Sequence, residues 1–267
     1  MSPRRRCRPA HSAFGRASLA ALGLLTVLFG TPAQARDPAE YPASESQFLI
    51  APYLYGMSVR GKIGLGNQVA PIDVGPEDIA GGINAAGMGY VMWTDPKQFI
   101  YAEGLGARWS DDSFDQFYDQ PVKAQLALFE MGYGRHFYAE TVAPAEGVMT
   151  VSPYLGLRYA QIDFKVPNQF QPLNARESWL DPVAGVIIEA PLLGPINYAL
   201  KADAAGFGLG RDHYWSFTAA ARYLYSKHWT ALFGYRVARF NARPGGDNIV
   251  RFELRGSGPE GGITYAF

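Results

Sequence analysis

The sequence predicts an all-β fold: a transmembrane antiparallel up-and-down β-barrel of about ten strands, with eight and twelve strands as alternatives. The first observation is the C-terminus, where Ile263, Tyr265 and Phe267 alternate with small or polar residues. Such alternation suits a strand between lipid and a polar lumen. The second is that no run of about 18 apolar residues follows residue 35. A membrane protein without such a run must cross with strands, because only helices and closed barrels satisfy the backbone in lipid.

The first 35 residues have the three regions of a secretory signal peptide. Four arginines lie among the first eight residues, an apolar run follows over 18–30, and Ala33-Gln34-Ala35 is a cleavage signal. A membrane-anchoring helix is the alternative, but the run is shorter than the roughly 20 residues that a span needs. We therefore expect 1–35 to be removed on export to the outer membrane of a Gram-negative cell. Residues 36–46 would form a short periplasmic leader, and 47–267 the barrel.

Charge and composition exclude several kinds of partner. The signal segment carries five arginines and no acid, so its removal leaves 19 basic residues against 24 acidic ones, a net charge of −5. This argues against nucleic acid, which needs a basic footprint. Cys7 leaves with the signal, so disulfides and a thiol nucleophile are excluded. The remaining histidines, His136, His213 and His228, are too widely separated to predict a metal site, and we expect no cofactor.

Strand-like segments, rich in Tyr, Phe, Val, Ala and Gly, recur between turn residues along the rest of the chain. Short connections, such as Thr94-Asp-Pro-Lys97 and Pro191-Leu-Leu-Gly194, alternate with longer polar ones, as expected for periplasmic turns and external loops. The loop 58–81 has the pattern of a hairpin of its own, Val59–Ile63 with Val69–Val74, and of a helical turn at 76–79. The expected strands are 47–57, 82–94, 98–109, 122–138, 149–165, 178–190, 195–208, 215–227, 229–242 and 250–267.

Four of these strands contain a proline in their interior, at Pro52, Pro153, Pro182 and Pro259. Proline donates no ladder hydrogen bond, and a closed barrel has no free edge on which to place it. Bulges or positions near the rim could accommodate these residues. The prolines are the strongest argument against the strand assignment.

Alternation assigns each side chain to lipid or lumen. A lipid-facing Arg or Lys at the midplane costs about 2–4 kcal/mol, so charged side chains should face inward. The third strand is ambiguous, because Glu103 shares a face with Tyr101 and Leu105. Four acids and four bases are predicted to line the lumen: Glu130, Asp181, Asp203 and Glu260 with Arg158, Lys201, Arg222 and Arg236.

This balance of charge has two interpretations. A small barrel has a lumen about wide enough for side chains to fill, and paired charges can persist there. The eight residues could therefore form a salt-bridge network that plugs the barrel. They could instead line a narrow polar pore, in which case Arg158→Ala or Asp203→Ala should change conductance or ion selectivity.

Aromatic residues gather near both expected membrane boundaries, as in the girdles of membrane barrels. The core of a soluble sandwich is the alternative source of such residues. The periplasmic girdle is predicted to contain Trp93, Phe99, Phe137, Trp229 and Phe267. The external girdle is predicted to contain Trp109, Trp179 and Trp215.

Four motifs occur in order in the second half of the chain: Trp179-Leu-Asp-Pro-Val-Ala-Gly185, Lys201-Ala-Asp-Ala-Ala-Gly-Phe-Gly-Leu-Gly-Arg-Asp212, Gly234-Tyr-Arg236 and Ser257-Gly-Pro259. Together they resemble a family of proteobacterial outer-membrane β-barrel proteins, within the wider group of small porin-like and opacity-type surface barrels. Ala202 and Ala205 replace glycines of the second motif, and Ile187 stands where an arginine is common. The resemblance implies the fold and the location, and it implies no settled activity.

Enzymatic barrels provide a competing interpretation. An omptin-like protease needs an Asp pair and an Asp/His pair at the external rim, and Asp111-Asp112 and Asp212-His213 lie in suitable loops. Each pair is adjacent in sequence, however, and neighbours on a strand point to opposite faces. The spacing of His213 and Ser216 does not fit a lipid-A deacylase. We therefore expect no catalytic residues.

The expected function is that of a non-enzymatic integral outer-membrane protein, either a structural or surface protein or a narrow passive pore for small polar solutes. The alternatives are an omptin-like protease and a surface adhesin. The expected partners are outer-membrane lipid, lipopolysaccharide and the barrel-assembly machinery, the last through the final strand ending in Phe267.

Overall fold

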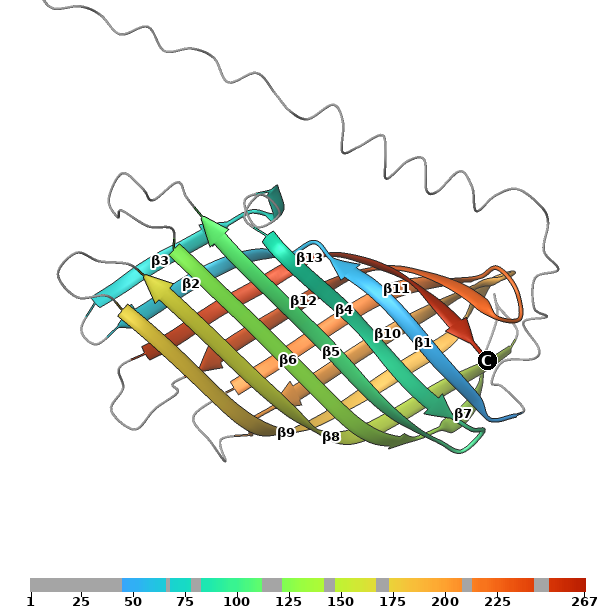
Figure 1. Cartoon of the computed structure of the whole chain (residues 1–267). Helices are drawn as coiled ribbons and strands as arrows, with labels where there is room; N and C mark the ends of the chain where they lie inside the picture. Colours follow the sequence, from blue (N-terminus) through green and yellow to red (C-terminus); the bar gives the residue numbers. More distant parts are fainter. Residues whose placement is uncertain are drawn as a thin grey trace, which may run out of the picture. The chain divides into compact units, whose positions relative to one another are not determined.

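The computed structural model describes residues 45–65, 68–77, 83–111, 122–141, 147–166, 173–207, 213–242 and 250–267. The expected signal peptide and most of the expected leader lie outside these residues. All described strands belong to one sheet, in which each strand is antiparallel to its neighbours (Figure 1). Within the described residues, no helix is long and apolar enough to cross a membrane.

Ten strands form the wall in the order β1-β4-β5-β6-β8-β9-β10-β11-β12-β13, and β13 pairs with β1 to close it. The predicted fold class is therefore confirmed: the chain is an antiparallel up-and-down barrel. The wall strands are β1 (Gln47–Tyr55), β4 (Ile83–Thr94), β5 (Gln98–Asp111), β6 (Val122–Arg135), β8 (Gly147–Val166), β9 (Leu173–Leu193), β10 (Ile196–Ala205), β11 (His213–Leu224), β12 (Trp229–Ala242) and β13 (Val250–Ala266).

Three further strands extend the wall. β2 (Ser58–Leu65) and β3 (Gln68–Val74) form the hairpin expected within 58–81, and a helical turn begins at Pro76. β2 pairs with the first half of β13, and β1 pairs with the second half. The short strand β7 (Phe137–Thr141) prolongs β6 along β8, in a region that the sequence pattern assigned partly to a turn.

The prolines explain why two wall strands are divided. Pro259 lies where the ladder passes from β1 to β2, and both partners keep the same register with β13 on either side of it. Pro153 lies in the same way where β6 gives way to β7. Pro52 falls in a gap of the β1–β13 ladder, and Pro182 lies where the ladder with β10 ends. Pro52, Pro153 and Pro259 thus lie where one flanking ladder is interrupted without a shift of register, whereas Pro182 lies at the end of a ladder.

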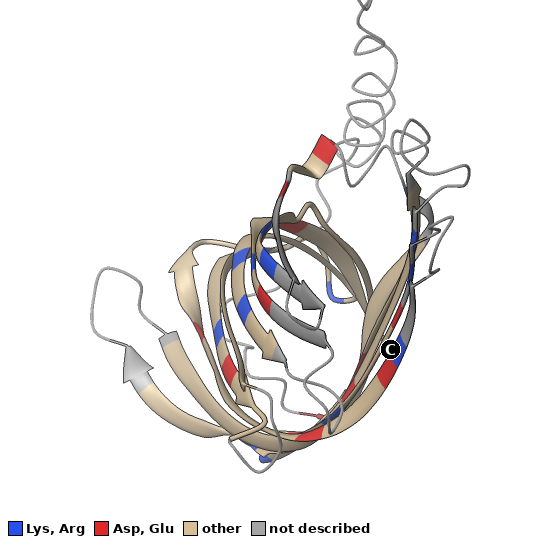
Figure 2. Cartoon of the chain, turned by 90° about the vertical axis from the view of Figure 1, so that its left-hand side faces the viewer, with Lys and Arg blue, Asp and Glu red and all other residues tan. Residues whose placement is uncertain are grey.

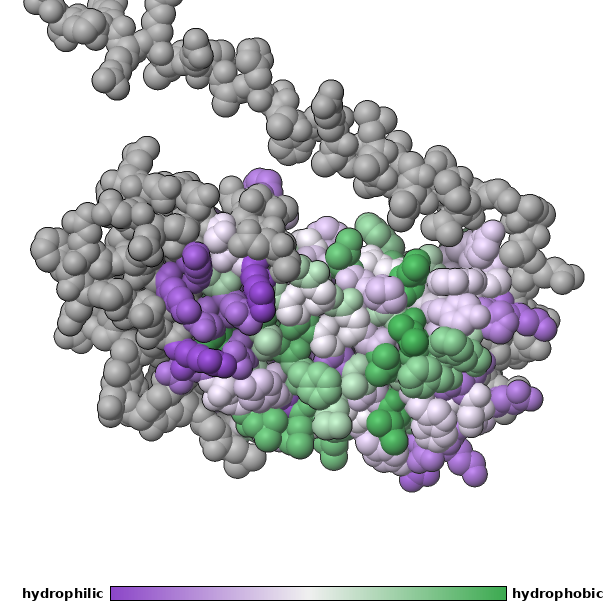
Figure 3. All heavy atoms as spheres, viewed as in Figure 1, coloured by the Kyte–Doolittle hydropathy of each residue, from purple (hydrophilic) through white to green (hydrophobic). Residues whose placement is uncertain are grey.

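The outer surface carries the apolar side chains. Figure 3 shows hydrophobic residues over the middle of the wall and hydrophilic ones towards its ends. Leu155 and Phe233 are 70% and 72% exposed, which water would not favour but acyl chains would. Trp93, Phe137, Trp229 and Phe267 are also exposed on the periplasmic side, as is Trp215 on the external side.

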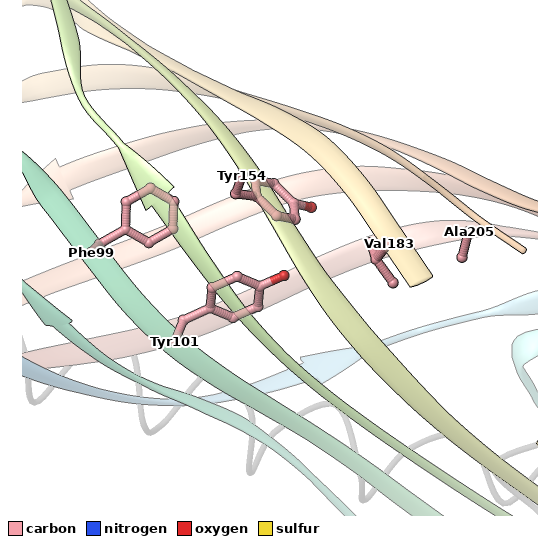
Figure 4. Close-up of a cluster of buried hydrophobic side chains, with 5 residues drawn as sticks. All are labelled: Phe99, Tyr101, Tyr154, Val183 and Ala205. Atoms are coloured by element: carbon pink, nitrogen blue, oxygen red, sulfur yellow. The ribbon is translucent and has the colours of Figure 1, made fainter. Parts of the chain in front are cut away.

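Three of the predicted girdle residues were assigned to the wrong face. Phe99 is only 1% exposed and belongs to a lumenal cluster with Tyr101, Tyr154, Val183 and Ala205 (Figure 4). Trp179 stacks on Phe240, with ring centroids 5.6 Å apart, and the indole nitrogen of Trp109 is buried. These rings fill the interior instead of meeting lipid.

Candidate functional site: a lumenal ion-pair network

Ten charged side chains meet inside the barrel, and we call them the lumenal network. They are the eight predicted residues Glu130, Asp181, Asp203, Glu260, Arg158, Lys201, Arg222 and Arg236, together with Glu103 and Glu189. Figure 2 marks charged residues along the strands, viewed towards the end of the barrel where β2 and β3 lie.

The first part of the network is centred on Arg158 of β8. Its guanidinium group donates hydrogen bonds to Glu130 of β6 and to Asp203 of β10, the latter over 3.1 Å. Asp181 of β9 lies directly opposite Arg158 in the ladder. Ser216 donates to the second oxygen of Asp203 over 2.7 Å. Glu130, Arg158 and Asp203 are all at most 9% exposed, so this part is buried.

The second part is centred on Glu103 of β5. Its carboxylate accepts a hydrogen bond from Lys201 of β10 over 3.1 Å and from the Tyr53 hydroxyl. Arg236 of β12 approaches it to 3.7 Å and pairs with Glu260 of β13 over 2.8 Å. β10 and β12 are each four places from β5 around the wall. The two ion pairs of Glu103 therefore cross the lumen, whereas the Arg236–Glu260 pair joins the neighbouring strands β12 and β13.

Aromatic rings hold the cations in place. The Arg158 guanidinium lies 4.0 Å from the centroid of the Tyr214 ring. The Lys201 ammonium lies 5.5 Å from the Tyr101 ring and 5.8 Å from the Tyr154 ring. Such distances give cation–π attraction that strengthens when the partners are desolvated. The Tyr101 hydroxyl also donates to Glu130, so it joins the two parts of the network.

A cavity of about 180 Å³ lies on the periplasmic side of this crossing. Glu103, Lys201 and Arg236 line it, together with rings such as Phe99 and Tyr101. A smaller space of about 80 Å³ lies at the periplasmic mouth, where Asp95 and Lys227 contribute. The ion pair of Arg222 with Glu189 lines both spaces and thus lies between them.

Beyond the network, the Trp179–Phe240 stack joins β9 to β12, which are three places apart in the wall. The stack and the two parts of the network thus place side-chain contacts between non-neighbouring strands at more than one level of the lumen.

The periplasmic turn between β4 and β5 is fixed by Asp95. Its carboxylate accepts hydrogen bonds from the backbone N–H of Lys97 over 2.6 Å and of Gln98 over 2.9 Å. The hydrogen bond from Lys97 is the main reason that the pKa of Asp95 lies below its usual range. Such a turn keeps β4 and β5 in register beside the mouth.

The sequence pattern missed Glu103 and Glu189. In β5 the larger residues Phe99, Tyr101 and Leu105 share the face of Glu103, and small residues occupy most of the other face. The rule that large apolar residues face lipid would therefore place Glu103 in lipid as well. The lumenal position of Glu189 could have been predicted, because Glu189 lies on the same face as Asp181 in one continuous expected strand. With both included, the network has six acids and four bases, not the balanced four and four.

Two of the four residues considered for protease chemistry, Asp112 and Asp212, lie outside the described part of the chain, while Asp111 ends β5 and His213 begins β11.

No family model matches the sequence, and no curated protein matches it. Solved structures do. Neisserial surface protein A is 12% identical, covers 83% of this chain and 97% of its own, and has a TM-score of 0.34. The translocator domain of the autotransporter NalP from Neisseria meningitidis is 14% identical, covers 94% and 96%, and scores 0.35. The attachment invasion locus protein Ail of Yersinia pestis is 8% identical, covers 84% and 99%, and scores 0.34.

These proteins are of the kind that the sequence motifs predicted, namely outer-membrane β-barrels. At such identities and scores the likeness carries no argument about activity. The assignment follows from the strand pairing and from the two faces of the wall, which make this chain a transmembrane β-barrel of the outer-membrane type.

Proposed function

We propose that the chain is a non-enzymatic integral outer-membrane protein whose closed barrel is a rigid scaffold for its external loops. The observation that carries this proposal is the crossing of the lumen by Glu103, Lys201 and Arg236. Paired charges anchored on opposite walls stabilise the barrel and block passage through it. A surface role then falls to the loops, since the interior is occupied.

A narrow passive pore for small polar solutes is the second candidate. The cavity on the periplasmic side favours it, because this cavity already reaches the crossing formed by Glu103, Lys201 and Arg236. Six carboxylates against four cations would favour cations in such a pore. Displacement of the ion pairs would be needed for it to open.

Planar bilayers distinguish these candidates. We expect the reconstituted wild-type protein to show no discrete conductance. The variant Glu103→Ala/Lys201→Ala removes one acid and one base from the crossing, and we expect it to conduct with a preference for cations. The matched control is Arg60→Ala/Asp73→Ala, which removes an exposed pair joined over 2.9 Å and should stay silent. Discrete channels in the wild-type protein would instead support the pore.

We further propose that the barrel-assembly machinery binds the strand that ends in Phe267. The ring of Phe267 is 65% exposed, while its backbone N–H donates to Phe48 over 2.9 Å. Phe267→Ala keeps the backbone contact, so we expect the unfolding free energy to change by less than about 1 kcal/mol. The amount inserted in cells should fall severalfold.

Quantitative blotting of outer-membrane fractions would measure insertion, and urea unfolding of the refolded variant would measure stability. Phe137→Ala, which removes another exposed periplasmic ring, is the control and should insert normally. Equal loss of insertion in both variants would contradict a specific role for the last residue.

A further inference from the structure

Three arginines lie side by side on the outer wall, and we call them the arginine row. Arg239 of β12 is directly opposite Arg255 of β13, and Arg255 is directly opposite Arg60 of β2. All three are exposed. Directly opposite residues on paired strands lie about 5 Å apart, so three positive charges fall within about 10 Å.

The protein itself neutralises little of this charge. Asp73 accepts a hydrogen bond from Arg60 over 2.9 Å. Within the described residues, no ion pair is formed by Arg239 or Arg255. Like charges directly opposite each other destabilise a sheet, so the row has an unfavourable energy unless an anion binds it. A guanidinium fork matches the geometry of phosphate oxygens.

The height of the row on the wall indicates where that anion lies. Tyr265 pairs with Trp229 at the periplasmic end of β13, ten residues along the strand from Arg255. That separation is about 33 Å along a strand, or about 25 Å of height at a tilt of about 40°. The apolar band of these barrels is about 25 Å tall. The arginine row therefore lies at the external boundary of the lipid.

A neighbouring tryptophan supports this depth. Trp215 of β11 is directly opposite Arg239 in the next ladder and is 44% exposed. Exposed tryptophans are enriched at the membrane–water interface. Trp215 and the three arginines thus lie side by side on four successive strands, at one depth in the membrane.

We infer that the arginine row binds the phosphate groups of a phosphorylated glycolipid in the outer leaflet. The inference rests on the proposed location in the outer membrane and assigns a lipid site to that wall. Arginine donates two parallel hydrogen bonds to one phosphate, and Trp215 packs beside the acyl chains. A free phosphate ion would offer the same oxygens, so the two sources must be separated by experiment.

The test compares Arg60→Gln/Arg239→Gln/Arg255→Gln with the wild-type protein, both folded in detergent. Binding of diphosphoryl lipid A is measured by native mass spectrometry. A cation near a lipid surface contributes about fivefold in affinity, so we expect a loss on the order of 100-fold for three. Arg→Lys at the same positions should keep part of the affinity, because charge remains and the fork is lost.

The matched control is Lys97→Gln/Arg135→Gln/Lys227→Gln, which removes three exposed cations at the periplasmic end. It should bind lipid A as the wild-type protein does. Dephosphorylated lipid A should bind the wild-type protein no better than it binds the arginine variant. Equal losses in the two triple variants would overturn the inference, and displacement of lipid A by millimolar inorganic phosphate would assign the row to free anions. The proposed function is tested separately. If the wild-type protein shows no conductance in bilayers, the proposed function stands even when one of these two results overturns the lipid site.

Discussion

Arg158→Ala is expected to destabilise the barrel by about 3–5 kcal/mol, the loss typical when one partner of a buried ion pair is removed. The guanidinium is the shared partner of Glu130 and Asp203, and Asp181 lies opposite it. Its loss leaves several buried carboxylates close together in an interior that water enters poorly. Urea unfolding, with the folded fraction read from unheated gels, measures the change.

Two controls separate burial from charge. Arg60→Ala breaks an ion pair whose side chains are 74% and 75% exposed, and it should cost less than about 1 kcal/mol. Glu130→Gln/Arg158→Met/Asp203→Asn removes the charges together and should recover most of the stability lost in Arg158→Ala. If Arg158→Ala unfolds at the same urea concentration as Arg60→Ala, the buried pairs contribute nothing to stability.

The sequence could predict the wall because each wall strand has a period-two pattern and ends in turn residues. The expected strand 229–242 and the structural strand Trp229–Ala242 coincide, and most other boundaries differ by only a few residues. The prediction of eight lumenal charges rested on a single cost, that of placing an ion in lipid.

The errors have a common physical origin in the lumen. An aromatic ring is suited to the lipid boundary, but it also fills a narrow interior, and the pattern alone cannot separate these uses. Phe99 and Trp179 face inward and meet partners distant in sequence: His136, between β6 and β7, at 5.1 Å between ring centroids, and Phe240 of β12 at 5.6 Å. Those contacts depend on strand order and closure, which are not local properties. Glu103 was left ambiguous for the same reason.

The prolines show a related limit. Each would break a ladder in an ideal barrel, so a local rule counts it against a strand. The closed sheet instead places Pro182 at the end of a ladder, and at the other three prolines it leaves a gap in one flanking ladder and keeps the register on both sides, as at Pro259. Only the pairing of distant segments reveals that gap.

Gly134→Val is expected to destabilise the barrel by about 1–3 kcal/mol through overpacking. A Cβ atom at Gly134 would clash with the Phe99 ring and would lie 2.8 Å from the backbone oxygen of Pro153. Phe99 is 1% exposed and stacks on His136, so the ring has little room to move. The backbone of β8 cannot move without disturbing its ladder. Urea unfolding and the yield of folded barrel measure the effect.

Gly104→Val is the matched control, because a Cβ atom there meets nothing within 4 Å. Valine suits a strand better than glycine does, so this variant should be neutral or slightly stabilised. Phe99→Leu in the Gly134→Val background should restore part of the stability, since it withdraws the ring that causes the clash. Equal stability of Gly134→Val and Gly104→Val would show that the Phe99 ring can move away from position 134. The lumenal aromatic cluster would then be loosely packed and not a fixed layer beneath the ion pairs.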